Sequence, residues 1–359
     1  MMPASLRAAQ TIGAGTARSA KSRSRFYRPE LDVLRFFAFL LVFESHAFEH
    51  VPTLNLHSGG YGVDLFFALS SYLITTLLLK EHAETGAINA GKFYFRRGLR
   101  IWPLYFFFLL VLIPLAHYTI GDRLDRYELA MFLVASGNWA CVVWGWPASI
   151  AAPLWSVSVE EQFYLVWPFA MKRFLHRLPA AAIALLVIAN ITRVCLALAG
   201  AGNTATWCNT FARLDPIALG ALLAWYLDGR IPELGYTLRS GLIAFGLGSF
   251  LFAGLIGAGS GWKSLWRYPL VAVAAVAILC GFLGMNVQWP KGLVYLGKIS
   301  YGLYVFHVGA LTLLAHYFPL DPIPALALTV FAAAVSYRFL ELPFLRLKER
   351  FTVVRSRPA

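Results

Sequence analysis

The 359-residue sequence contains few charged residues. Only 14% of its residues are charged, against about a quarter in an ordinary soluble domain. Hydrophobic residues make up 59% of the chain and aromatic residues 15%. A soluble core cannot hide so many apolar side chains, so the composition excludes a soluble globular protein. It predicts an all-α polytopic membrane protein.

The sequence also has few cysteines, and they follow no disulfide or zinc pattern. Cys141, Cys195, Cys208 and Cys280 lie in or beside apolar runs, and no two of them have CxxC spacing. The HExxH zinc motif is missing as well. We therefore expect neither a disulfide framework nor a bound metal, and we interpret the cysteines as small core residues.

Acidic residues are scarce, since 18 Asp and Glu stand against 31 Lys and Arg, for a net charge of +13. A basic balance can indicate nucleic-acid binding, but no soluble basic surface is available here. The basic residues instead cluster at the ends of apolar runs, as in membrane proteins with positive cytoplasmic loops. Segments 1–28 and 346–359 are accordingly predicted to be basic cytoplasmic tails. Segment 1–28 is not interpreted as a targeting peptide, because no apolar signal core precedes the first run.

Apolar runs of about twenty residues, the length that crosses a bilayer as a helix, recur along the chain. They cover 31–49, 62–80, 99–117, 127–146, 157–175, 179–199, 212–228, 239–258, 267–286, 297–317 and 322–341. Both ends of the chain are basic, and basic residues from Lys172 to Arg177 close the run 157–175. The positive-inside rule puts these three places in the cytoplasm. That requires one of the first four runs not to cross.

The run 127–146 is the expected exception, because Gly137, Asn138 and several tryptophans interrupt it. Irregular backbone of this kind is typical of re-entrant or interfacial segments. The sequence thus predicts about ten transmembrane helices plus one re-entrant or interfacial segment. They form one membrane domain over 29–345, with both termini in the cytoplasm.

The first run, LDVLRFFAFLLVFESHAFEH, carries charges that a lipid anchor does not need. Each charge in hydrocarbon costs about 2.5–3.5 kcal/mol on insertion scales. On a helix, Arg35 and His46 share one face and are separated by about 16 Å of axial rise. That face is therefore expected to look into protein or water. It offers a guanidinium suited to phosphate at one end and an imidazole that exchanges protons near neutral pH at the other.

The predicted topology sorts the other charges by depth. Asp64, Glu160 and Glu161 start spans from the outer side, so we expect three carboxylates at the level of His46. Three arginines, Arg96, Arg97 and Arg100, are expected at the cytoplasmic mouth. Arg97 and Arg100 are three residues apart and share a helix face.

This layout suits acyl transfer. A neutral histidine can take the proton of an incoming hydroxyl while a carboxylate holds its tautomer, so His46, Asp64, Glu160 and Glu161 are the candidate catalytic residues. Arg35, Arg97 and Arg100 are the candidate binding residues for the phosphates of an acyl-coenzyme A donor. The long pantetheine arm of such a donor can span the distance between the two ends.

Several motifs then suggest a family. They are LDVLRFFAFLLVFESH with Arg35 and His46, GVDLFFALSSYLIT, FYFRRGLRIWPLY with Arg97 and Arg100, LWSVSVEEQFYLVWP with Glu160 and Glu161, ISYGLYVFH, and ELPF. In this order, over residues 27 to 345, they resemble the transmembrane acyltransferase family 3, the integral-membrane enzymes that O-acylate bacterial glycans and some secondary metabolites. Ser71 and Tyr72 depart from it, because the family's second-helix motif usually reads Gly-Phe there.

The resemblance implies about ten spans in the bacterial cytoplasmic (inner) membrane. It also implies transfer of an acetyl or short acyl group from cytosolic acyl-coenzyme A to an extracytoplasmic hydroxyl of a sugar or glycan, with acetyl-coenzyme A as the expected donor. In that reaction the histidine acts as the base and the arginines bind the donor. Some relatives carry a C-terminal soluble esterase-like domain, which is not expected here because the chain ends soon after Glu341.

Each assignment has a structural alternative. His46 could be a hydrogen-bonded histidine at a helix end, the arginines could be positive-inside anchors, and the carboxylates could favour helix N-termini. His307 and Tyr301 are candidate tunnel-lining residues, with core packing as the alternative. For the whole chain the alternative function is a secondary transporter or flippase. The acceptor, the acyl length, a covalent acyl-histidine step and the oligomeric state are left open by the sequence.

Overall fold

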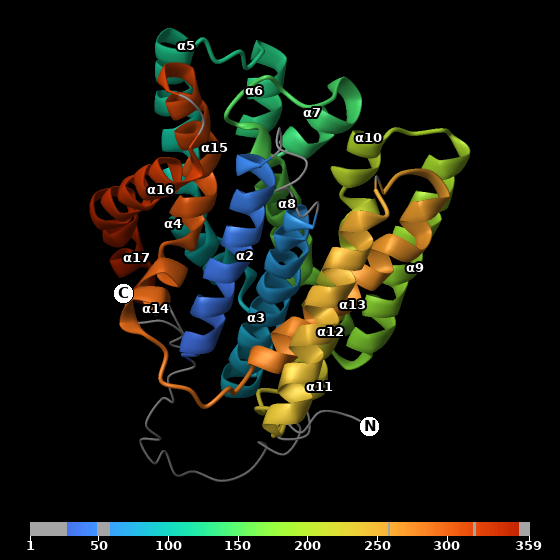
Figure 1. The fold of residues 1–359 in the computed structure, drawn as a ribbon. Helices are drawn as coiled ribbons and strands as arrows, with labels where there is room; N and C mark the ends of the chain where they lie inside the picture. The colour runs from blue at the N-terminus through green and yellow to red at the C-terminus, as the bar shows by residue number, and fades with distance from the viewer. Residues whose placement is uncertain (1–26, 49–57, 258, 319–320, 352–359) are drawn as a thin grey trace.

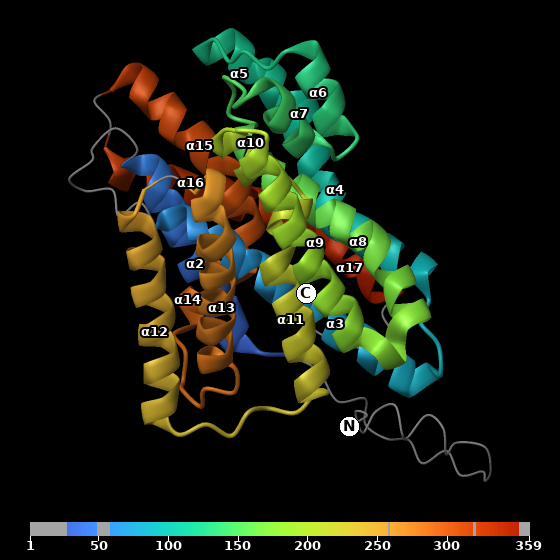
Figure 2. The same cartoon turned by 90° about the vertical axis from the view of Figure 1, so that its right-hand side faces the viewer.

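The computed structural model describes residues 27–48, 58–257, 259–318 and 321–351, and these residues form helices and their connections. No strand occurs among them, apart from an isolated bridge between Arg123 and Ala148. The predicted tails 1–28 and 346–359 lie mostly outside the described residues. Figures 1 and 2 show the helices gathered into one bundle around α2 and α3.

The first half of the chain supplies the helices α2 Pro29–Ala47, α3 Gly62–Thr85, α4 Ala90–Phe107, α5 Ile113–Ile120, α6 Arg126–Leu133, α7 Gly137–Trp144, and α8 Trp155–Phe174. The second half supplies α9 Leu178–Leu198, α10 Asn203–Trp207, α11 Leu214–Leu227, α12 Tyr236–Leu255, α13 Ser264–Phe282, α14 Lys291–Lys298, α15 Ser300–Tyr317, α16 Pro322–Ser336, and α17 Leu342–Glu349. One π-helical segment joins α4 to α5 and another joins α16 to α17.

Local sequence explains where several of these helices begin and end. The Asn89 side chain accepts a hydrogen bond from the Lys92 amide at the start of α4. Asp125 and Glu128 form a reciprocal capping box at the start of α6. Gly86, which follows α3, has φ +74°, a conformation that costs a glycine little. Side-chain caps and a glycine stop therefore fix these ends.

The predicted apolar runs coincide with helices, with one exception. The run 127–146 holds two eight-residue helices, α6 and α7, separated by a turn in which Ala135 has φ +53°. Each rises only about 12 Å, well short of the hydrocarbon thickness. No single helix thus occupies the run for which we predicted an incomplete crossing.

Within the described residues, six helical stretches are long and apolar enough to cross a membrane, and a seventh is added if the bent pair α14 and α15 is one span. The stretch Ala152–Leu198 has 47 residues and contains both α8 and α9. Helix α2 stands outside this count because of its charges, and α11 because it has only 14 residues. The predicted total of about ten spans is therefore not confirmed by helix length and composition.

Helices α2 and α3 hold the bundle together. Side chains of α2 belong to all three apolar clusters of the core, through Val42, Leu34 and Phe39. Close approach of the neighbouring helices depends on glycine: a Cβ on Gly297 of α14 would lie 1.8 Å from the Asp32 carbonyl oxygen of α2. Small residues let membrane helices approach in this way. The contact sets the base of α2 against the 74° bend between α14 and α15.

Candidate functional site

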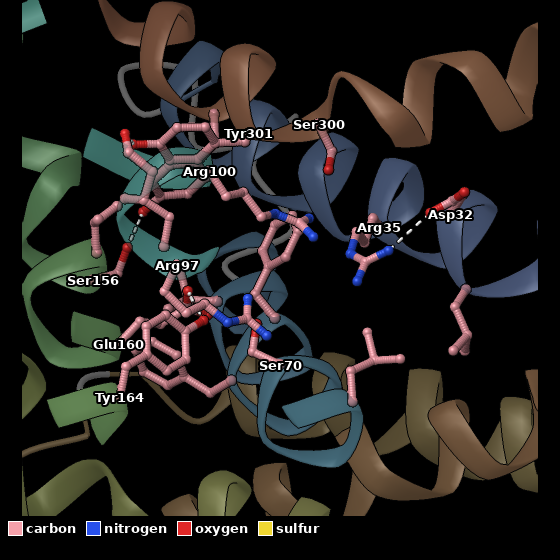
Figure 3. A pocket seen from close by; sticks show the side chains of 18 of the residues that line it. Asp32, Arg35, Ser70, Arg97, Arg100, Ser156, Glu160, Tyr164, Ser300 and Tyr301 are labelled. Carbon is pink, nitrogen blue, oxygen red and sulfur yellow. Dashed lines mark hydrogen bonds and ion pairs between the residues drawn. The ribbon is translucent and has the colours of Figure 1, made fainter. Parts of the chain in front are cut away.

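A cavity opens between α2, α3, α4, α8 and α15. Its charged and polar lining residues are Arg28, Asp32, Arg35, Ser70, Arg97, Arg100, Ser156, Glu160, Tyr164, Ser300, Tyr301 and Tyr304, with Tyr27 beside them. Apolar side chains such as Phe66, Phe67 and Leu73 complete the wall. Helices from both halves of the chain thus build one polar space inside the bundle (Figure 3).

Three predicted donor-binding arginines meet in this cavity. Arg35 comes from α2, and Arg97 and Arg100 come from successive turns of one face of α4. Figure 3 shows their guanidinium groups directed toward a common space. Arg35 donates to Asp32 at 2.8 Å, with only 12% of its side chain exposed. Arg97 also lies over the Tyr164 ring, 4.9 Å from its centroid. Guanidinium groups gathered in this way suit an anion with several phosphates.

Arg96 has a different position from its neighbour Arg97. It forms an ion pair with Glu81 of α3 at 2.7 Å and is not among the cavity residues. Its other contact is a hydrogen bond to the Phe351 carbonyl oxygen at 3.3 Å. Of the three arginines at this end of α4, Arg96 therefore ties helices together, while Arg97 and Arg100 face the cavity.

The two adjacent glutamates of α8 also separate. Glu160 lines the cavity and accepts a hydrogen bond from the Tyr164 hydroxyl at 2.8 Å. Glu161 points elsewhere and accepts from the Trp102 indole of α4 at 3.0 Å. Consecutive residues of a helix differ by about 100° in direction. This difference puts Glu160 among the arginines and Glu161 against the outer side of α4.

Asp64 forms a buried ion pair with Arg213, the residue just before α11. The two side chains are 1% and 0% exposed, and their charged atoms are 2.8 Å apart. Arg213 also lies over the Trp207 ring at 4.2 Å and the Tyr268 ring at 4.9 Å. Asp64 thus joins α3 to α11.

The three carboxylates expected at the level of His46 each have contacts with other side chains. Asp64 has Arg213, Glu161 has Trp102, and Glu160 lies among the cavity arginines. Depth was estimated from the run boundaries, but the direction of each side chain depends on helix rotation. Rotation turns these carboxylates toward other helices.

His46 instead meets a second histidine, His307 of α15. The Nε2 of His307 lies 3.3 Å from the Nδ1 of His46, and the ring centroids are 5.0 Å apart. The His46 Nδ1 also lies 2.9 Å from the Val42 carbonyl oxygen one turn earlier in α2. His307 is fully buried, whereas His46 is partly buried. The two histidines lie outside the cavity lining and next to it.

Tyr304 connects the cavity with this histidine pair. It lines the cavity, its ring lies 5.5 Å from the His307 ring, and its carbonyl oxygen is 2.6 Å from the His307 Nδ1. Its hydroxyl group contacts Ser156 at 2.6 Å. Tyr301, one turn earlier, lines the cavity as well and donates to the Ile101 carbonyl oxygen at 3.1 Å. Of the two candidate tunnel-lining residues, the cavity therefore includes Tyr301 and not His307.

The sequence analysis did not predict a second buried ion pair. It also did not predict that Arg28 lines the cavity. Arg193 of α9 contacts both oxygens of Asp215 of α11 with its two terminal nitrogens, and both side chains are almost fully buried. A signal was available, because Arg193 is a charge inside an apolar run. Arg28, interpreted only as part of a basic tail, lines the cavity.

The sequence that forms this bundle matches a known protein family. A family model described as an acyltransferase domain (Acyl_transf_3) matches residues 28–340. The chain belongs to this family. The match contains every cavity helix and both histidines.

Curated relatives agree with the family assignment. The chain is 28% identical over 360 residues to O-acetyltransferase OatA of Staphylococcus aureus, with the same values for strains NCTC 8325 / PS 47 and COL. These alignments cover 91% of this chain and 58% of the relative. The chain therefore spans less than two thirds of the length of these relatives. No solved structure gives a significant match. The family and the apolar helices together identify a multi-pass membrane protein.

Proposed function

We propose that this protein is an O-acyltransferase of the O-acetyltransferase type. It takes an acetyl or short acyl group from cytosolic acyl-coenzyme A and transfers it across the membrane to a hydroxyl of a sugar or glycan. The observation that carries the proposal is the arrangement along α2, with arginines in a cavity near one end and a histidine pair near the other. The relatives named O-acetyltransferase support the same reaction type.

The arginine cavity suits the donor. Coenzyme A carries a diphosphate and a further phosphate, and guanidinium groups bind phosphate oxygens in bidentate fashion. Arg35, Arg97 and Arg100 supply three such groups around one space, and Arg28 adds a fourth. Because these groups come from α2 and α4, they hold the donor's charged end at one side of the bundle. Glu160 in the same wall limits the excess of positive charge.

The length of α2 suits the donor's arm. Helix α2 is continuous from Pro29 to Ala47, so Arg35 and His46 are about 16 Å apart along its axis. The pantetheine chain is long and flexible enough to cover this distance. The cavity extends toward Tyr304, the neighbour of the histidine pair. The thioester would thus arrive beside His46 while the phosphates remain on the arginines.

The reaction needs one base. His46 takes the proton of the acceptor hydroxyl, whose oxygen forms a new bond to the thioester carbonyl carbon. The carbon–sulfur bond breaks, and the coenzyme A thiolate leaves and takes up the proton from the imidazolium. General base catalysis of this kind contributes about a hundred- to ten-thousand-fold in rate. The products are an ester and free coenzyme A.

The membrane arrangement belongs to the proposal. The basic loops lie on the arginine side of the bundle, so we propose that this side faces the cytoplasm and the His46 side faces outward. The compartment is then the bacterial cytoplasmic membrane, with both termini inside. Donor and acceptor approach from opposite sides and need not meet in one aqueous compartment.

Replacement of His46 tests the proposal. Purified His46→Ala protein should bind acetyl-coenzyme A as the parent does, because the arginine cavity is intact. Cells that produce this variant should add no labelled acetyl group to surface glycans, as measured by mass spectrometry. His316→Ala is the matched control, because His316 is an exposed histidine of α15 far from the pair.

The result separates the alternatives. Loss of glycan acetylation with unchanged donor binding in His46→Ala, and full activity in His316→Ala, supports the assignment. Glycan acetylation that persists in His46→Ala removes the proposed base. Acetyl-coenzyme A that fails to bind the parent protein at all removes the proposed donor.

A further inference from the structure

The histidine pair differs from a histidine held by a carboxylate. His307 is fully buried on α15, and its two ring nitrogens have two different partners. The Nδ1 lies 2.6 Å from the carbonyl oxygen of Tyr304, and the Nε2 lies 3.3 Å from the His46 Nδ1. The Phe39 ring packs nearly perpendicular to it, with the ring centroids 6.0 Å apart. The ring is thus fixed by contacts on several sides.

These contacts determine where the protons are. A carbonyl oxygen only accepts hydrogen bonds, so the His307 Nδ1 must carry the proton that it shares with Tyr304. In neutral His307 the Nε2 is then the acceptor nitrogen and faces His46 with its lone pair.

The same reasoning settles the tautomer of His46. Its Nδ1 has two acceptors near it, the Val42 carbonyl oxygen at 2.9 Å and the His307 Nε2 at 3.3 Å. The Nδ1 therefore carries the proton, and the Nε2 carries the lone pair that a general base needs. The other tautomer would bring the Nδ1 lone pair of His46 against both the Val42 carbonyl oxygen and the lone pair of the His307 Nε2, which is unfavourable.

We infer that His307 is a positioning residue, which accepts a hydrogen bond from the Nδ1 of His46 and so holds the Nε2 of His46 ready to receive the hydroxyl proton. This inference rests on the proposed role of His46. His307 takes the place that a carboxylate has in a Ser-His-Asp triad. Val42 belongs to the same helix as His46, whereas His307 fixes the imidazole relative to α15, whose residues Tyr301 and Tyr304 line the donor cavity.

Two polar substitutions of His307 separate the functions of its two nitrogens. In His307→Gln, the side-chain amide reaches the position of Nε2 and can accept from His46. In His307→Asn, the amide reaches only the position of Nδ1, so it keeps the contact with Tyr304 and loses the one with His46. Both variants are polar and close in size, which makes them matched controls for each other.

The expected result is a difference in turnover without a difference in donor binding. His307→Asn should lower kcat at least about tenfold, the rate equivalent of one hydrogen bond. His307→Gln should keep most of the parental kcat, and the KM for acetyl-coenzyme A should stay within about twofold of the parent value in both. Binding of acetyl-coenzyme A to each purified variant shows whether the variant is folded, and this measurement does not depend on His46 acting as a base.

Other outcomes overturn the inference. Equal kcat in the two variants, whether both are active or both inactive, shows that acceptance by the Nε2 position is not required. A raised donor KM with unchanged kcat makes His307 a tunnel-lining residue. These results differ from the one that would overturn the proposed function, namely that the His46→Ala protein is still active. An inactive His46→Ala with equal His307 variants would leave the acyltransferase assignment intact and remove only the positioning role.

Discussion

At the residue scale, adjacent positions in this protein have different tasks. Arg96 forms an ion pair with Glu81, whereas Arg97 faces the cavity. Glu160 faces the cavity, whereas Glu161 accepts from Trp102. Helix rotation thus divides neighbouring charges of the sequence between the cavity wall and contacts that join helices.

This division predicts the effect of removing a cavity arginine. Arg97→Ala should raise the KM for acetyl-coenzyme A at least about tenfold, because a hydrogen bond to a charged group is worth about 1.5–3 kcal/mol. The kcat at saturating donor should change much less. The comparison is Lys92→Ala, an exposed cation on the same helix. Equal KM values for the two variants would argue against donor binding by Arg97.

A buried ion pair predicts a stability change at the same scale. Arg213→Ala leaves Asp64 as an uncompensated buried charge, and such a loss costs about 3–5 kcal/mol. Thermal unfolding in detergent should therefore occur at a clearly lower temperature than in the parent. The double variant Asp64→Asn with Arg213→Gln should recover part of the loss, because no lone charge remains. Arg177→Ala, at an exposed arginine, should unfold like the parent. A double variant no more stable than Arg213→Ala would contradict this explanation.

At the scale of elements, α2 depends on close contact with α14. The helix carries both Arg35 and His46, and α14 touches it at Asp32 through Gly297. The position of the cavity arginine on α2 therefore depends on a helix that supplies no cavity residue of its own.

Substitution of glycine tests this contact. A Cβ at position 297 would lie 1.8 Å from the Asp32 carbonyl oxygen, so Gly297→Ala should force α14 away from α2. Overpacking of this kind costs about 1–3 kcal/mol, which should appear as a lower thermal unfolding temperature. A methyl group added at Gly292 of the same helix would meet no neighbouring element within 4 Å. Gly292→Ala should therefore be neutral or slightly stabilising, and an equal loss in both variants would contradict the explanation.

At the scale of the whole molecule, the bundle has two chemically different ends. Figures 1 and 2 show the connection between α3 and α4 at one end, and α5, α6 and α7 at the other. The first connection lies on the arginine side of the cavity, and the second group lies on the side of the histidine pair. The proposed transfer requires these ends to face different compartments.

Labelling of single introduced cysteines tests that requirement. In a background in which the four native cysteines are replaced, Ala87→Cys and His176→Cys should react only when a membrane-impermeant reagent reaches the cytoplasmic side. Arg126→Cys should react from outside. All three residues are exposed in the structure. Labelling of Ala87→Cys and Arg126→Cys from the same side would exclude transfer across the membrane by this route.

The sequence alone determined the helical membrane class, the positions of the helices and the motifs that identify the family. These depend on apolar run length, charge at the run ends and residue order, which are properties of the chain itself. It also placed Arg97 and Arg100 on one face, because their spacing belongs to a single helix.

The tertiary structure alone decided which side chains meet. Rotation of α3 and α8 directs Asp64 and Glu161 to Arg213 and Trp102, and packing of α15 against α2 brings His307 to His46. Those two histidines are separated by 261 positions, so no local spacing could predict their contact. The helical period shows which residues of one helix share a face. Which other helix that face meets depends on how the helices pack.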